Sequence, residues 1–424
     1  MKKIWILFLL QLVIVAILKP FITDLEFSSL YFVFIHSILT ILILLQYKTK
    51  LKYLFILGFL LRVFTMFWDI YFHDIFNLPN SGADSEMYYY YAVQISNYES
   101  FSNLFTRGGL YSFINGVMFL FIGTQRIIGQ YLNVIFGLNV IILVFKILNL
   151  LNINDSKKLI SIAILAVFPN SLIMSGIFLR ESIITFLATI SLYYFTLWFL
   201  TNKNKYMFHS ILFVGLASAF HAGMIALFLG YAFSFLFYSS KYNNFIFSKR
   251  TIFTFLLLFF VFIFSYFRYQ EVFFAKFTKL DQIGDYFTTV NSRLGGSAYL
   301  KFLKIDSPLL LVLFGPIKFI YFYIAPLPID WRNIFDVITF FFDSMLYLYV
   351  MIKISDFVLN EKNKFSTVYK NYVFSLIMVI VFVSIIFGSG VSNTGTALRH
   401  RQKFISNFIV LLGLINLSKK ELKK

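Results

Sequence analysis

The chain has 424 residues, of which 59% are apolar, 21% aromatic and 13% charged, whereas soluble domains carry roughly 25% charged residues. This composition excludes a soluble globular protein, and the absence of cysteine excludes disulfides, thiolate metal ligands and a cysteine nucleophile. The net charge of +18 would suggest nucleic-acid binding in a soluble protein. Here the basic residues lie between apolar runs and at the C-terminus, as the positive-inside rule expects.

Many apolar runs reach about 17–20 residues, the length that crosses the hydrocarbon core of a bilayer. We therefore predict an all-α fold, a polytopic transmembrane helical bundle of about 11–13 membrane segments with re-entrant pieces and an outer-face cavity. The expected location is the bacterial cytoplasmic (inner) membrane, with both termini in the cytoplasm. Residues 1–424 are expected to form a single integral membrane domain with outer-face loops at about 73–107, 268–306 and 389–403.

The first three spans are expected at Ile4–Phe21, Leu30–Leu45 and Leu51–Phe72. The first follows two lysines as a signal peptide would, but no small-residue cleavage site follows it, so we interpret it as a membrane helix. Lysines at its start and in the second loop place the acidic, tyrosine-rich segment after the third span at the outer face. In that segment Asn80–Gly82 predicts a turn, after which Asp84 or Ser85 is expected to cap a helix.

Further spans are expected at Ile127–Leu151, Leu159–Phe178, Ser182–Leu200 and Thr251–Phe267. The glycine-containing segment 108–123 is only moderately hydrophobic, which favours a re-entrant or interfacial piece. Residues Phe208–Tyr238 would form either one long tilted helix or two short helices that meet near His221. Basic residues after this segment favour the broken form, with His221 at its outer end.

The segment Ser307–Ala325 contains Gly315-Pro316 at its centre, where proline is expected to break the helix. Span counts taken forward from the N-terminus and backward from the basic C-terminal tail agree if this segment is a re-entrant hairpin. They also agree if Phe208–Tyr238 is a single span. We prefer the hairpin, because non-helical backbone at membrane depth is tolerated where it lines a water-filled cavity.

Arg180 and Glu181 stand where one apolar run begins, and His221 stands where another ends. A charged side chain at membrane depth is costly, so it marks a functional site by default. In the functional interpretation Arg180 binds an anionic donor and Glu181 orients it, while His221 shuttles a proton or binds a sugar hydroxyl. The structural alternatives are a self-neutralising Arg–Glu pair and a hydrogen-bonded interfacial histidine.

A second candidate is the sequence ALRHRQKF at Ala397–Phe404, just before the last span. Arg399 and Arg401 flank His400 at the outer face, against the positive-inside trend. Arginine suits bidentate phosphate contacts, so these residues could clamp a lipid-linked phosphate or diphosphate. The alternative is a basic stop whose side chains reach lipid head groups.

Asp84 and Glu86 offer a carboxylate that could act as general base on an acceptor hydroxyl. Either could equally be a helix cap or a solvated loop charge. The tyrosines Tyr88–Tyr91 supply flat faces suited to sugars, or an aromatic belt at the membrane interface. Two carboxylates alone are a weak signal for a divalent cation, and no Walker-type or HExxH motif occurs, so no cofactor or metal is predicted.

Several of these motifs resemble those of known families of membrane proteins. Gly82, Asp84 and Tyr88 form a Gly-x-Asp-x-x-x-Tyr pattern, and Arg180 opens a span followed about 40 residues later by Phe220-His221. In this the chain resembles the bacterial exopolysaccharide and O-antigen polymerase (Wzy-type) superfamily. Phe-Pro before Arg-Glu, Pro-Leu-Pro-x-x-Trp and the C-terminal Arg-His-Arg are also similar to polytopic proteins grouped with lipid-dependent GT-C glycosyltransferases. The resemblance runs from about residue 82 to 404.

The resemblance implies an enzyme that joins sugar units at the outer membrane face from a polyprenyl-diphosphate-linked donor, with matching positions at Asp84, Arg180, His221 and Arg399. We therefore predict membrane-embedded glycosyl transfer in cell-surface polysaccharide assembly (capsule, exopolysaccharide or O-antigen), in the form of repeat-unit polymerisation. The predicted catalytic residues are Asp84, Glu86 and His221. The predicted diphosphate-binding residues are Arg180, Glu181, Arg293, Arg332, Arg399, His400 and Arg401.

Other functions stay open at this point. They are a GT-C-type transferase that uses a lipid-monophosphate sugar, a flippase or transporter of lipid-linked saccharides, and an acyltransferase or ligase acting on the same lipids. The expected partners are a polyprenyl-linked oligosaccharide such as an undecaprenyl diphosphate conjugate, membrane lipids and other polysaccharide-assembly proteins. No nucleic acid is expected.

Overall fold

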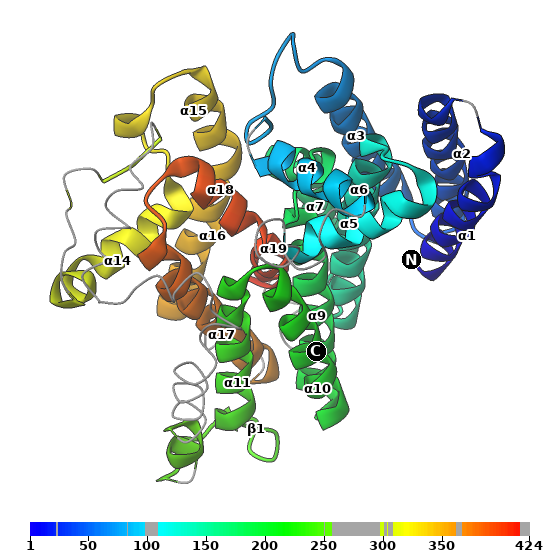
Figure 1. Cartoon of the computed structure of the whole chain (residues 1–424). Coiled ribbons are helices and arrows are strands. Elements are labelled where there is room, and N and C mark those ends of the chain that lie inside the picture. Colours follow the sequence, from blue (N-terminus) through cyan, green and yellow to red (C-terminus); the bar gives the residue numbers. More distant parts are fainter. Residues whose placement is uncertain are drawn as a thin grey trace. The chain divides into compact units, whose positions relative to one another are not determined.

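The computed structural model describes residues 1–22, 24–82, 84–97, 109–249, 251–256, 297–300, 303, 308–361 and 367–415. Helices make up most of these residues (Figure 1). The sheet that they contain has two short antiparallel strands, β1 (Tyr238–Ser239) and β2 (Asn244–Phe245). The predicted all-α fold is confirmed.

The described residues contain seven helices long and apolar enough to cross a membrane, or eight if one bent pair is counted as a span. The chain is therefore a polytopic membrane protein. The seven helices are Lys2–Phe21, Leu25–Leu45, Lys52–Tyr71, Arg126–Leu150, Glu181–Thr201, Ile334–Asn360 and Thr367–Gly388. Most of the predicted span Thr251–Phe267 and of the predicted outer loop 268–306 lies outside the described residues.

The chain forms two compact units. Unit 1 comprises Met1–Asn149 and Asn154–Thr189, and unit 2 comprises Leu150–Ile153 and Ile190–Lys424. The boundary falls inside the long helix α9 (Glu181–Thr201).

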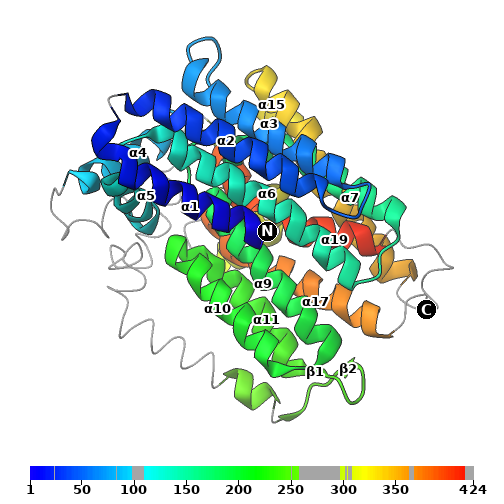
Figure 2. The same cartoon turned by 90° about the vertical axis from the view of Figure 1, so that its right-hand side faces the viewer.

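Unit 1 contains the helices α1 to α8 and the first part of α9. Their bounds are α1 Lys2–Leu18, η1 Lys19–Phe21, α2 Leu25–Leu45, α3 Lys52–Tyr71, α4 Asp84–Ser96, α5 Gly109–Ile122, α6 Arg126–Leu150, α7 Asp155–Val167 and α8 Pro169–Gly176. The apolar window of α6 is 89% buried, against 11% for that of α1, so α6 is the core helix and α1 faces outward. Figure 2 shows α1 and α2 alongside α6, and His36 of α2 is 2.9 Å from the Tyr131 hydroxyl of α6.

The turn before α4 follows the prediction. Asn80 and Gly82 have left-handed backbone conformations, with φ of 68° and 81°, which asparagine and glycine adopt most readily. The Gly82 amide donates to Ser85 Oγ at 3.0 Å, and the helix begins at Asp84. The helix α5 has 14 residues, too few for the roughly 20 that cross a bilayer, and packs against α4.

The predicted span Leu159–Phe178 is not one continuous helix. The structure has two helices, α7 and α8, bent by 48° at a break beside Phe168. Pro169 is the first residue of α8, a position that suits a residue without an N–H, and it forces Phe168 out of the helical conformation.

Unit 2 contains the rest of α9 and the helices that follow. Their bounds are α10 Asn204–Phe220, η3 Ala222–Met224, α11 Ile225–Phe237, α14 Pro308–Ile324, η4 Pro328–Asp330, α15 Ile334–Thr339, η5 Phe340–Ser344, α16 Met345–Asp356, η6 Phe357–Glu361, α17 Thr367–Val383, η8 Ser384–Gly388, α18 Thr394–Gln402 and α19 Ile405–Ile415. The predicted break near His221 is present, because His221 is extended between α10 and η3. The helices α10 and α11 pack side by side, and α11 packs against α17 (Figure 1).

The predicted break at Gly315-Pro316, and with it the re-entrant hairpin, is wrong. The helix α14 runs from Pro308 to Ile324 with Pro316 inside it. Proline removes one hydrogen bond, and tertiary packing supplies most of the stability of a helix. That packing is close here, since a Cβ on Gly388 would lie 2.8 Å from the Phe319 ring. The predicted outer loop 389–403 likewise contains the helix α18, capped by Asn393.

Candidate functional site

The sequence-predicted site residues fall into two groups, one in each unit. The group in unit 1 is Asp84, Glu86, Arg180 and Glu181, and the group in unit 2 is His221, Arg332, Arg399, His400 and Arg401. Arg293 lies outside the described residues. Each group is described by itself, and the expectation of one shared cavity stays a prediction.

In unit 1, the non-helical connection between α8 and α9 leads directly to Arg180. Its carbonyl groups are bound by two amides of α6. Gln130 Nε2 donates to Gly176 O at 3.0 Å, and Asn133 Nδ2 donates to Ile177 O and Leu179 O at 2.9 Å each. Backbone polar groups in a membrane have no water to pair with, so these amides hold the connection in place.

An aromatic residue of α4, Tyr88, contacts Arg180 and packs in turn on Tyr111 of α5. The Arg180 guanidinium carbon lies 5.5 Å from the centre of the Tyr88 ring, a cation–π distance. The Tyr88 and Tyr111 rings meet edge to face at 5.6 Å, and the Tyr111 hydroxyl accepts a hydrogen bond from Asn133. Arg180 is half-buried and Glu181 is fully buried.

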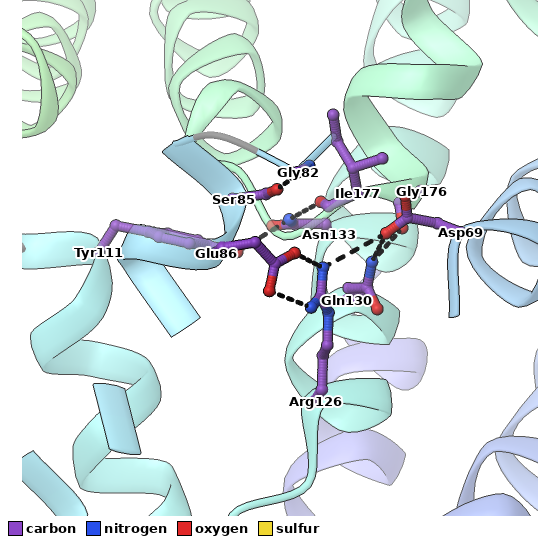
Figure 3. A network of polar contacts seen from close by, with 10 residues as sticks. All are labelled: Asp69, Gly82, Ser85, Glu86, Tyr111, Arg126, Gln130, Asn133, Gly176 and Ile177. Carbon is purple, nitrogen blue, oxygen red and sulfur yellow. Dashed lines mark hydrogen bonds and ion pairs between the residues drawn. The ribbon is translucent and has the colours of Figure 1, made fainter. Parts of the chain in front are cut away.

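A second arginine, Arg126, lies beside this cluster (Figure 3). Its guanidinium binds both oxygens of Glu86, at 2.7 and 2.6 Å, and lies 5.5 Å from the Tyr89 ring centre. Its Nη2 is also 3.6 Å from Oδ2 of the buried Asp69, which accepts from Gln130 Nε2 at 2.6 Å. Glu86 can serve as a general base only after Arg126 releases it.

Sequence reasoning missed Asp69, Arg126 and the buried Arg62. A usable signal existed for all three. Arg62 and Asp69 lie inside the predicted span Leu51–Phe72. The rule that singled out Arg180, that charge at membrane depth marks function, applies to them equally. Arg126 carried the signal that singled out Arg180, since it stands directly before the predicted span Ile127–Leu151.

In unit 2, His221 and His400 meet on one aromatic ring. The Phe387 ring stacks on His221 at 5.4 Å and contacts His400 at 4.9 Å, and the two imidazole centres are 4.8 Å apart. Lys403 Nζ lies 2.9 Å from His400 Nδ1 and 5.8 Å from the Phe387 ring centre. The α10–η3 break and the helix α18 thus bring together two predicted residues and one unpredicted lysine.

The partners of the two imidazoles fix where a neutral ring carries its proton. The Lys403 ammonium has only donors, so Nδ1 of His400 accepts and the proton lies on Nε2. His221 Nδ1 accepts from the Gly223 amide at 3.1 Å, which leaves its proton on Nε2 as well. In the neutral form both rings therefore carry their hydrogen-bond donor at Nε2.

A further lysine joins this group from α14. Lys318 is buried, and its ammonium donates to Ser389 O at 2.9 Å, two residues from Phe387. We call His221, Lys318, His400 and Lys403 the basic cluster. Four basic side chains from three segments converge on residues 387–389, which favours an anionic ligand.

Arg401 points into the scaffold of unit 2. It is fully buried, donates to Tyr323 O at 2.7 Å and to Ala325 O at 2.8 Å, and forms an ion pair with Asp343. To bind a diphosphate, as predicted, it would have to exchange these partners. The neighbouring Arg399 is half-buried on α18.

Arg332 is bound by Asp336 through three hydrogen bonds of 2.8 to 2.9 Å. These bonds raise the pKa of the Arg332 guanidinium, which is therefore a permanent cation. Asp330 accepts from the Tyr321 hydroxyl at 2.7 Å and from the Leu327 amide.

The described residues contain no group of three or more His, Cys, Asp or Glu side chains arranged to hold a metal ion. Comparison of the chain with protein-family models, with curated proteins and with solved structures finds no match. The described residues thus contain a basic cluster in unit 2 and an arginine–carboxylate network in unit 1.

Proposed function

We propose that the protein is a membrane-embedded glycosyltransferase of bacterial cell-surface polysaccharide assembly. In this proposal it joins repeat units from a polyprenyl-diphosphate donor at the outer face of the cytoplasmic membrane. The observation that carries the proposal is the basic cluster, because it gathers four cationic or hydrogen-bond-donating side chains within a polytopic membrane protein. A lipid-linked diphosphate is an anion that reaches such a site from the membrane.

The proposed reaction develops negative charge where the basic cluster can neutralise it. An acceptor hydroxyl attacks the anomeric carbon of the donor sugar, and a new C–O bond forms. The bond from that carbon to the diphosphate oxygen breaks, and the lipid diphosphate leaves with the electron pair. Lys318, Lys403 and the Nε2–H of His400 stabilise this charge, and such electrostatic stabilisation usually contributes more to an enzyme's rate than any other single effect.

The acceptor hydroxyl gives up its proton to a base. His221 is the predicted base in the unit that holds the basic cluster, and Asp84 and Glu86 of unit 1 stay predictions. Two of these bases are hydrogen-bonded at the atoms that would accept the proton, and those bonds must break first. Arg126 binds both oxygens of Glu86, and the Gly223 amide donates to His221 Nδ1. We assign Arg401 to the scaffold, and we retain Arg180 and Arg399 as proposed ligand-binding residues.

A chromosomal deletion tests the proposal. We expect the deletion strain to accumulate a lipid-linked single repeat unit and to lose long surface glycan. Plasmid-borne His400→Ala and Lys318→Met should fail to restore chain length, while immunoblots show normal membrane levels. The control His209→Ala should restore it fully, since the hydrogen bond of His209 is exposed and goes to Lys205 O of its own helix. A deletion strain with glycan of normal length would contradict the proposal.

The same strain separates the alternative functions. A GT-C-type transferase that uses a lipid-monophosphate sugar predicts an incomplete repeat unit that lacks one sugar. A flippase predicts complete repeat units held at the cytoplasmic face. Polymerase loss predicts complete single repeats at the outer face, which an added membrane-impermeant glycosidase can digest in spheroplasts.

A further inference from the structure

The chain segment that ends at Arg180 is connected to Glu86, which is half-exposed, by an unbroken series of polar contacts. Glu86 binds Arg126, Arg126 lies 3.6 Å from Asp69, Asp69 accepts from Gln130 at 2.6 Å, and Gln130 donates to Gly176 O at 3.0 Å (Figure 3). All five residues belong to unit 1. The last contact lies four residues before Arg180.

Gln130 and Asn133 are placed to act together on this segment. They lie three residues apart on α6 and therefore on one face of the helix. Their amide nitrogens hold the carbonyls of Gly176, Ile177 and Leu179, and both amides are fully buried. Since those carbonyls can pair only with donors, the orientation of each amide is fixed.

We infer that Gln130 and Asn133 are positioning residues for Arg180, and that the Glu86–Arg126 pair sets how firmly Gln130 holds the chain. The inference rests on the proposed function only in giving Arg180 a ligand. The coupling itself is a property of the protein without substrate.

The coupling arises because two donors compete for one carboxylate oxygen. Arg126 Nη2 is 2.6 Å from Glu86 Oε1 but 3.6 Å from Asp69 Oδ2, so Glu86 holds the guanidinium away from Asp69. Gln130 Nε2 uses the same Asp69 Oδ2. When Glu86 leaves, Asp69 becomes the remaining carboxylate for Arg126, and the attraction between two full opposite charges moves Oδ2 toward Arg126 and away from its present position at Gln130.

Loss of the hydrogen bond between Gln130 and Asp69 then affects the backbone. Gln130 loses the contact that orients its amide, and its bond to Gly176 O weakens. The segment that carries Arg180 becomes looser. A ligand group that replaces Glu86 on Arg126 preserves the hydrogen bond between Asp69 and Gln130, and the segment that carries Arg180 stays ordered. Whether Arg126 has an anionic partner therefore determines how well Arg180 is placed.

Hydrogen exchange of the purified full chain in detergent, followed by mass spectrometry, tests this inference. Glu86→Gln should raise exchange of the amides at 177–182 about two- to fivefold, the range that an exposed ion pair contributes. Asp155→Asn, which removes the exposed Lys158 pair of α7, should leave those amides unchanged. Global stability should be the same in both variants.

The decisive result is non-additivity. In a Gln130→Met background, exchange at 177–182 is already raised, and Glu86→Gln should add nothing. If Gln130→Met fails to fold, Asp69→Asn serves instead, because it removes the charge that draws Arg126. An equal Glu86→Gln effect in either background, or no effect in the wild-type background, overturns the inference. These measurements use no substrate, so they stand whether or not the chain transfers sugars.

Discussion

Each unit contains a fully buried arginine that binds the last carbonyls of a helix beside a proline. In unit 1, Arg62 donates to Leu165 O and Ala166 O at the end of α7, at 3.2 Å each, and to Ser171 Oγ at 2.9 Å. It thereby spans the break before Pro169. The orphan carbonyls of a helix end, which need partners when they are buried, are paired here by a side chain.

In unit 2, Arg401 does the same at the end of α14. It donates to Tyr323 O and Ala325 O, directly before Pro326, and its Nη2 reaches Ser344 Oγ at 3.3 Å. Two unrelated stretches of sequence thus use one solution, a guanidinium and a serine hydroxyl at a helix end that a proline follows.

The two sites differ in their counter-charge. Arg401 forms an ion pair with Asp343, whereas no carboxylate of the described residues contacts Arg62. A helix C-terminus carries about half a negative charge, and four hydrogen bonds surround Arg62. Helix-end carbonyls can therefore hold a buried cation without an acidic partner, so such an arginine is not by itself evidence of a missing anion.

The largest predicted effect is that of Arg401→Met. It should destabilise the protein by about 3–5 kcal/mol, because removal of one partner strands a buried charge on Asp343. Unfolding in detergent, by heat or by denaturant, measures this. The double variant Arg401→Met, Asp343→Leu should recover most of the loss. A double variant as unstable as the single one would mean that the ion pair is not what matters.

Arg62→Met should lower the free energy of unfolding by less, about 2–3 kcal/mol, because it leaves buried carbonyls unpaired but no buried charge without a partner. Arg62→Lys should fall between the wild type and Arg62→Met, since an ammonium can satisfy some of the same carbonyls. The same unfolding assay ranks the three proteins. If Arg62→Met destabilised the protein as much as Arg401→Met, the acidic partner of Arg401 would not explain a difference between the two arginines.

Gly137→Ala tests the packing around Arg62 with a smaller change. The added Cβ would lie 2.5 Å from Ser175 Oγ and 2.8 Å from Arg62 Nε, and we expect a loss of about 1–2 kcal/mol from overpacking. Gly215→Ala in α10 is the matched control, because nothing lies within 4 Å of its Cβ position. It should be neutral or should stabilise by about 0.5–1 kcal/mol through helix propensity. Equal effects at both glycines would show that Arg62 is loosely packed.

The sequence predicted the features that depend on local pattern. Apolar length identified the spans at Ile4–Phe21, Leu30–Leu45, Leu51–Phe72, Ile127–Leu151 and Ser182–Leu200. The turn at Asn80–Gly82 and the break at His221 were also correct. The effects of proline were not predictable in this way. Pro169 interrupts a helix whose end Arg62 satisfies, while Pro316 lies inside a helix that packing on η8 holds together. Whether a proline interrupts a helix or lies within it depends here on side chains that are distant in the sequence, so the residues around the proline do not reveal it.

In the candidate site, too, some residues could be predicted from local pattern, and others depend on contacts between distant parts of the chain. Position relative to apolar runs singled out Arg180, His221 and His400. Lys318 contacts the same short segment, residues 387–389, as His221 and His400, but in the sequence it is one lysine in an apolar helix. Its contact with Ser389 O joins residues 71 positions apart. Arg401 illustrates the opposite case, where a motif read as ligand-binding contains a residue enclosed by the scaffold.

The most direct test of the central claim is reconstitution of the purified chain in liposomes with the lipid-linked single repeat unit isolated from the deletion strain. We expect wild-type protein to produce a ladder of lengthened glycan with release of polyprenyl diphosphate. Both products should fall at least about tenfold in His400→Ala, the loss expected for a group that stabilises the leaving charge. Wild-type protein that leaves the repeat unit unextended, or His400→Ala protein as active as the wild type, would contradict it.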